Sequence, residues 1–162
     1  MTQHKINFTA EQITALFIEA ARSSDIDLLS QFLEAGMPVD CTDSRGYTPL
    51  IVATYNDHLE TARFLLEKGA NPDAVDLKGA TALSGVAFKG YEAIADLLIE
   101  KGASVDKPNH AGRTPLMFAV MFGREAMVKK LLQAGANPDH EDMEGVSARA
   151  LAQKQGVGHL FT

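Results

Sequence analysis

The side chains that could carry chemistry in this chain are five histidines, one cysteine and the carboxylates. A metal site needs several ligands that converge at a defined spacing, and the sequence offers no such His-Cys or His-Glu cluster. Cys41 has no histidine in its own turn to activate it, so we interpret it as an ordinary turn residue and not as a nucleophile. We therefore predict that the protein is not an enzyme and that it holds no metal and no cofactor.

Charge and hydropathy exclude further classes. The net charge of −6 disfavours nonspecific binding to nucleic acid or to an anionic membrane, which needs clustered Lys and Arg, and Lys129-Lys130 is the only adjacent basic pair. The sequence contains no run of about 18 apolar residues, so we predict no membrane-spanning helix. The first residues lack the basic and apolar segments of a signal peptide, although a chain that had lost its leader would look the same. We expect a cytoplasmic protein.

The elements that must position these side chains repeat every 33 residues, with glycine at Gly46, Gly79, Gly112 and Gly145. The neighbours of these glycines recur in register, as in Asp43-Ser-Arg-Gly-Tyr-Thr-Pro-Leu50, Asp76-Leu-Lys-Gly-Ala-Thr-Ala-Leu83 and Asn109-His-Ala-Gly-Arg-Thr-Pro-Leu116. A second series closes each unit: Gly69-Ala-Asn-Pro-Asp73, Gly102-Ala-Ser-Val-Asp106 and Gly135-Ala-Asn-Pro-Asp139. Residues 33 apart are said below to share a phase.

Period and motif resemble the ankyrin repeat, a turn followed by two antiparallel helices. The resemblance covers about nine tenths of the chain and implies an all-α solenoid of stacked helix-turn-helix units with β-turn or hairpin tips. We expect one domain over residues 1–162. It would comprise an N-terminal capping repeat at 1–42, full repeats at 43–75, 76–108 and 109–141, and a partial C-terminal capping repeat at 142–162.

Capping residues in the sequence indicate where helices begin. Thr9 with Gln12 forms a capping-box pattern, and the first helix of each full repeat is predicted to begin at a threonine, namely Thr48, Thr81 and Thr114. Asp57 replaces the glycine that links the two helices elsewhere, so it must adopt a positive φ. The family pattern implies that His58 caps the second helix. Arg149 stands where the other repeats carry Leu, which suits a water-facing end cap.

The resemblance implies a concave binding face made by the turn tips and the exposed sides of the first helices. One column there carries Tyr55, Phe88 and Met121 at the same phase, and aromatic residues and Met are enriched in interfaces. Basic side chains surround the column, which suggests a partner segment with acidic residues around an apolar anchor. The predicted partner-binding residues are Arg45, Tyr47, Tyr55, Lys78, Phe88, Lys89, Arg113, Met121 and Phe122.

Several alternatives stay open. The column could instead pack between the first helices, since some apolar residues at a surface are normal. The favoured function is a monomeric protein-protein interaction module, although the column could also pair with its own copy. The chain could be an ankyrin fragment of a larger protein whose other domain carries the activity. A third possibility is a small-ligand or cofactor carrier with a cleft near Phe88, Met121 and His110.

Overall fold

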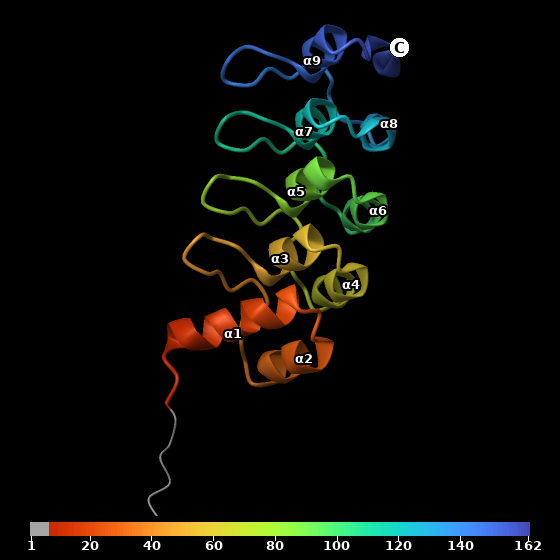
Figure 1. Ribbon diagram of the computed structural model, residues 1–162. Coiled ribbons are helices and arrows are strands. Elements are labelled where there is room, and N and C mark those ends of the chain that lie inside the picture. Colours follow the sequence, from red (N-terminus) through yellow and green to blue (C-terminus); the bar gives the residue numbers. More distant parts are fainter. Residues whose placement is uncertain (1–6) are drawn as a thin grey trace, which may run out of the picture.

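Helix pairs joined by extended turns stack one upon another along the chain (Figure 1). The computed structural model describes residues 7–162. First helices form one row: α1 (Ala10–Arg22), α3 (Pro49–Tyr55), α5 (Ala82–Lys89), α7 (Pro115–Met121) and α9 (Ala148–Lys154). Second helices form another row: α2 (Ile26–Glu34), α4 (Leu59–Glu67), α6 (Glu92–Glu100) and α8 (Glu125–Gln133). A 3₁₀ helix, η1 (Gly158–Phe161), follows α9 and takes the place of a further second helix. No helix within residues 7–162 has the length and apolar character needed to cross a membrane.

Side-chain caps start the first helices where the sequence predicts. The Thr9 hydroxyl accepts a hydrogen bond from the Gln12 backbone N–H at 3.1 Å, and the Gln12 side chain accepts one from the Thr9 N–H at 2.8 Å. Both halves of the capping box are therefore present. The same hydroxyl cap, onto the N–H three residues later, begins the first helices of the later repeats at Thr48, Thr81, Thr114 and Ser147.

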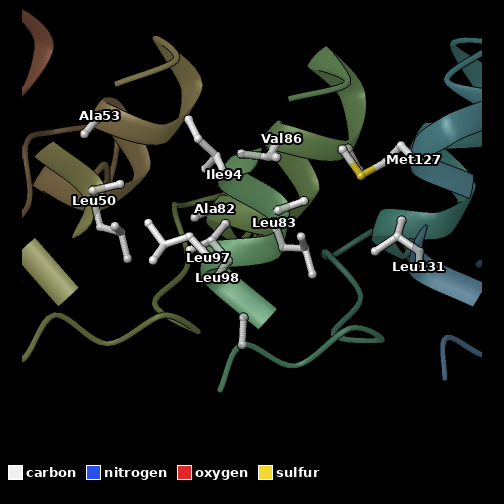
Figure 2. Packing of buried hydrophobic residues seen from close by; sticks show 14 of the residues in the cluster. Leu50, Ala53, Ala82, Leu83, Val86, Ile94, Leu97, Leu98, Met127 and Leu131 are labelled. Atoms are coloured by element: carbon white, nitrogen blue, oxygen red, sulfur yellow. The ribbon is translucent and has the colours of Figure 1, made fainter. Parts of the chain in front are cut away.

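The apolar core runs the length of the stack in layers. Leu83 on α5 and Leu98 on α6 are fully buried, as are their counterparts in the neighbouring repeats. Figure 2 shows Leu50, Leu83 and Leu131 in successive layers and not around one centre. Since each first helix packs against the first helices before and after it, a buried side chain here belongs to the boundary between two repeats.

Backbone hydrogen bonds tie each turn tip to the next. The Leu77 N–H donates to the Arg45 carbonyl at 3.1 Å, and the two following tips repeat this bond in the same register at 2.9 Å and 3.0 Å. Deeper in the loops, the Asp73 carboxylate accepts from the Ser104 N–H at 2.8 Å, with equivalent bonds in the repeats before and after. These bonds hold neighbouring repeats at a constant spacing.

The residue that links the two helices of a pair has a left-handed backbone conformation, with positive φ. Asp57 has φ of +62° and Ser24 has φ of +59° at the phase where Gly90 and Gly123 stand, so the prediction for Asp57 is confirmed. His58 is the N-cap residue of α4, but the predicted capping by its side chain is wrong, because the side chain makes no hydrogen bond to that helix. Its Nε2 lies 2.8 Å from the carbonyl oxygen of Arg22, at the end of α1, because the long imidazole reaches back to a terminal carbonyl of the preceding unit. Arg124, at the same phase two repeats further along, does the same and donates to the Phe88 carbonyl at 3.0 Å.

Arg149 caps the last unit in place of a buried leucine. Its guanidinium donates to both oxygens of Asp139, at 2.7 Å and 3.2 Å, and to the Phe161 carbonyl at 3.4 Å. Asp139 shares its phase with Asp73 and Asp106, which bond the backbone of the following repeat. At the last repeat the arginine supplies the donors that a following loop supplies elsewhere.

Replacing Leu98 with alanine is expected to destabilise the domain by about 2–5 kcal/mol, because the cavity would lie between two repeats that depend on each other. Urea unfolding followed by circular dichroism measures this change. Leu77→Ala is the matched control, because that leucine is 69% exposed and its removal should change stability by about 0.5 kcal/mol at most. Equal losses at the two sites would contradict the layered core.

Candidate binding surface on the first helices and turn tips

Three aromatic rings form a continuous row across the first helices. Tyr55 ends α3, and its ring stacks on that of Phe88 with centroids 6.4 Å apart and planes 12° from parallel. Phe88 in turn meets Phe122 edge-on, with centroids 4.4 Å apart. Tyr55 and Phe122 are 44% and 46% exposed, whereas Phe88 and Met121 are half-buried. The aromatic row (Tyr55, Phe88 and Phe122) therefore packs upon itself and still presents apolar surface to the outside.

The predicted basic residues divide into two kinds. Arg113 lies 3.7 Å from the Asp142 carboxylate in the next turn, so its charge is already balanced. Arg45, Lys78 and Lys89 make no ion pair within residues 7–162. The Lys89 ammonium instead sits 4.7 Å from the Tyr55 ring centroid, and the Arg45 guanidinium 5.5 Å from that of Tyr47. The face thus combines aromatic rings with three cations that have no carboxylate partner in this part of the chain.

A cavity of about 330 Å³ opens beside the row, between the first and second full repeats. Three of the predicted binding residues, Arg45, Tyr47 and Tyr55, line it together with the small residues Ala80 and Gly85. The other predicted residues do not line this cavity: Lys78 lies on a turn tip, and Phe88, Met121 and Phe122 continue along the first helices.

Two exposed apolar residues at turn-tip positions of the predicted face lie outside the nine predicted partner-binding residues. Leu77 and Met143 are 69% and 79% exposed and share a phase at the turn tips, with His110 between them. Their N–H groups belong to the bonds that join successive tips, which leaves their side chains pointing away from that backbone contact. The available signal was a large apolar residue at a turn tip, where polar and small residues are the rule.

Comparison with known proteins identifies the architecture. A family model described as ankyrin repeats in three copies matches residues 2–76 and again residues 70–142. The chain belongs to the ankyrin repeat family. No curated protein matches it significantly. The predicted family and the predicted all-α solenoid are therefore confirmed. Ankyrin repeats are generally protein-interaction modules and generally not enzymes.

Two histidines of this ankyrin stack contact the backbone of its turns. His140 Nε2 lies 3.1 Å from the Gly112 carbonyl, and the His110 ring packs so closely over Gly79 that an added Cβ would lie 2.6 Å from it. No three His, Cys, Asp or Glu side chains of the described residues converge to hold a metal ion. Burial, and then the negative charge of Asp40, raise the pKa of the Cys41 thiol from 9.0 to about 11. A thiol so protonated at neutral pH is a poor nucleophile.

Tyr55→Ala is expected to lower the free energy of unfolding by much less than Leu98→Ala, because a large part of the Tyr55 ring is already in water. The same urea titration compares the two variants. A loss at Tyr55 as large as that at Leu98 would support packing as the main role of this ring.

Iodoacetamide at about pH 8 is expected to alkylate Cys41 in the folded ankyrin domain roughly 100-fold more slowly than in the urea-unfolded chain, because the thiolate fraction falls with the raised pKa. Alkylation followed by mass spectrometry measures both rates. Equal rates in the two states would contradict the raised pKa.

The same shift makes stability depend on alkaline pH. The fold favours the neutral thiol, so its stabilising contribution is complete below pH 9.0 and is lost as pH rises from 9.0 towards 11. The difference in melting temperature between the wild type and Cys41→Ser should therefore change across this window and stay constant below it.

Proposed function

We propose that this ankyrin domain is a non-enzymatic interaction module that binds one protein partner through its concave face. The observation that supports it best is the exposed aromatic row, with Lys89 beside it, Arg45 at the adjoining cavity and Lys78 on a turn tip, in a protein whose net charge is −6. Aromatic side chains and Arg are the residues that most often dominate binding energy, while solvated surfaces favour Lys and Glu. A cationic border within an acidic protein favours a partner segment that carries acidic residues around an apolar anchor.

The two kinds of side chain would act differently. The rings of Tyr55 and Phe88 would set affinity, since burying apolar area against a partner contributes about 25 cal/mol per Å². The border cations would mostly raise the association rate and select against basic partners. Three repeats offer room for a typical interface of about 800 Å² per partner.

The proposed organisation is a single domain over residues 1–162 that acts as a monomer. Full repeats at 43–75, 76–108 and 109–141 would carry the binding residues, between capping units at 1–42 and 142–162. In the last unit, Arg149 and η1 support this division, because the arginine satisfies Asp139 where no further repeat follows within the chain. A cytoplasmic location fits the single cysteine, which has no partner in the chain for a disulfide.

The carrier alternative has less support than the interaction module. It predicts a cleft near Phe88, Met121 and His110, but none of these three residues lines the cavity beside Tyr55. The His110 ring is already packed against the Gly79 backbone. A fragment of a larger protein would use the same face, so that alternative concerns the rest of a longer chain and not the binding surface.

The decisive experiment is a comparative pull-down from an extract of the source organism. The variant Tyr55→Glu/Phe88→Glu/Met121→Glu should lose a protein that the wild type captures, because three carboxylates would stand on the apolar column. The matched control, Ala93→Glu/Ala126→Glu/Gln133→Glu, adds the same charge at exposed positions of the second helices and should keep that protein. Circular dichroism and thermal melting confirm that both variants are folded.

Quantitative mass spectrometry of the captured proteins gives the readout. Equal capture by the wild type and the concave-face variant would contradict the proposed surface. If only the second-helix control loses the captured protein, the binding surface lies on the second helices and not on the concave face. Capture of nothing by any form would favour the fragment and carrier alternatives.

A further inference from the structure

The cavity beside Tyr55 has its origin in two small residues of the second full repeat. Ala80 stands at the phase where the neighbouring repeats carry Tyr47 and Arg113. Gly85 stands where they carry larger apolar residues, Val52 and Phe118. A Cβ added to Gly85 would lie 3.2 Å from Cδ2 of Tyr55, so the ring of Tyr55 rests directly on this glycine. Two departures from the repeat pattern thus leave a space of about 330 Å³ that no other repeat is shaped to form in the same way.

The walls of the cavity suit an apolar side chain. Tyr47, Ile51, Val52 and Tyr55 supply its apolar surface. Two polar groups of its wall already have partners: the Asn56 amide nitrogen donates to the Val52 carbonyl at 2.7 Å, and the Thr81 hydroxyl accepts from the Ser84 N–H at 3.2 Å. A hydrocarbon or aromatic group entering this space therefore removes apolar surface from water without leaving these groups unpaired.

One carboxylate oxygen of Asp76, another wall residue, is occupied too. Its Oδ1 accepts from the backbone N–H groups of Lys78 and Ala80, at 2.8 Å and 2.9 Å. This oxygen is therefore committed to the turn of its own repeat.

The border of the cavity is cationic. Arg45 lines it beside the Tyr47 ring. Lys89 does not line the cavity, but its ammonium lies 4.7 Å from the centroid of the Tyr55 ring, which does. Neither cation has a carboxylate partner within residues 7–162. Arg22 also lines the cavity and pairs with Glu19 at 3.1 Å, where both side chains are largely exposed and the pair is weak. An anion approaching the mouth of the cavity would therefore meet two available cations and a third that exchanges easily.

We propose that this cavity takes one bulky apolar side chain from an extended acidic segment of the partner. Carboxylates next to that anchor would meet Arg45 beside Tyr47 and Lys89 beside Tyr55. The inference rests on the proposed function of the concave face. It specifies the feature of the partner that this face recognises. A volume of about 330 Å³ lies at the lower end of the roughly 300–1,000 Å³ typical of small-molecule pockets, which suits a single side chain better than a cofactor.

The aromatic row gives the segment a path beyond its anchor. Phe88 and Phe122 continue from Tyr55 across the second and third full repeats. A segment anchored beside Tyr55 would therefore extend over these rings, parallel to the direction in which the repeats stack.

The test uses a phage-displayed library of random peptides, selected on the full-length wild-type protein. The enriched peptides should share a Phe, Tyr, Trp or Leu with Asp or Glu on either side. A synthetic peptide of the enriched sequence is then measured by fluorescence anisotropy against Ala80→Tyr, which fills the cavity with the residue that Tyr47 shows is accepted at this phase. Its Kd should weaken by at least about tenfold, as expected when a buried apolar anchor is excluded.

Matched variants separate the cavity from other effects. Val146→Tyr places the same side chain at the same phase in the last unit, away from the cavity, and should change Kd by less than about twofold. Arg45→Glu should weaken binding and reduce its dependence on salt, because it reverses a border charge. A shift of the Gly85 backbone amide in NMR titrations of the wild type would place the peptide at the cavity.

Each outcome has a definite meaning. Enrichment of no peptide, or of peptides without the acidic and apolar pattern, overturns the inference. An unchanged Kd with Ala80→Tyr overturns it as well. If that peptide still loses binding to Tyr55→Glu/Phe88→Glu/Met121→Glu, the concave face survives and only the anchoring cavity is wrong. If neither variant weakens binding, the proposed face and the cavity fail together.

Discussion

The structure depends on apolar contact between repeats that cannot bury their helices alone. Leu98 and its counterparts are fully buried because the next helix pair covers them, and the core of residues 7–162 is spread in layers along the stack. The bond from the Leu77 N–H to the Arg45 carbonyl is repeated along the tips and gives the turns the same spacing as the stacked helices. Loss of one layer therefore weakens two repeats at once.

This constraint leaves one side of the molecule free to vary. The side chains that face the next repeat keep their size and type, while those on the tips and on the outer side of the first helices are not held to any pattern. Tyr55, Phe88 and Phe122 occupy that free side and pack on one another as well as facing outwards. Packing and exposure are therefore compatible in the aromatic row, because a ring of this size has enough surface for both.

Much of the fold could be predicted from residues close together in the sequence. The threonine caps, the capping box at Thr9 and the positive φ of Asp57 depend on neighbours within a few positions, so their residue types are sufficient evidence. The prediction for His58 failed because its partner, the Arg22 carbonyl, belongs to the preceding unit. The candidate site was less predictable still. Arg113 pairs with Asp142, so it is not one of the unpaired cations, and the large exposure of Leu77 and Met143 at the turn tips is known only from the tertiary structure.

By itself, the sequence determined the period, the family and the starts of the first helices at Thr9, Thr48, Thr81 and Thr114. It could do so because each repeat makes the same contacts with the next, so a regular spacing along the chain becomes a regular spacing in space. Only the tertiary structure decided which cations stay unpaired, how far each ring is exposed and where a cavity forms. Those properties arise where side chains of different repeats meet: Ala80 and Gly85 leave a space only because Tyr47 and Tyr55 stand opposite them.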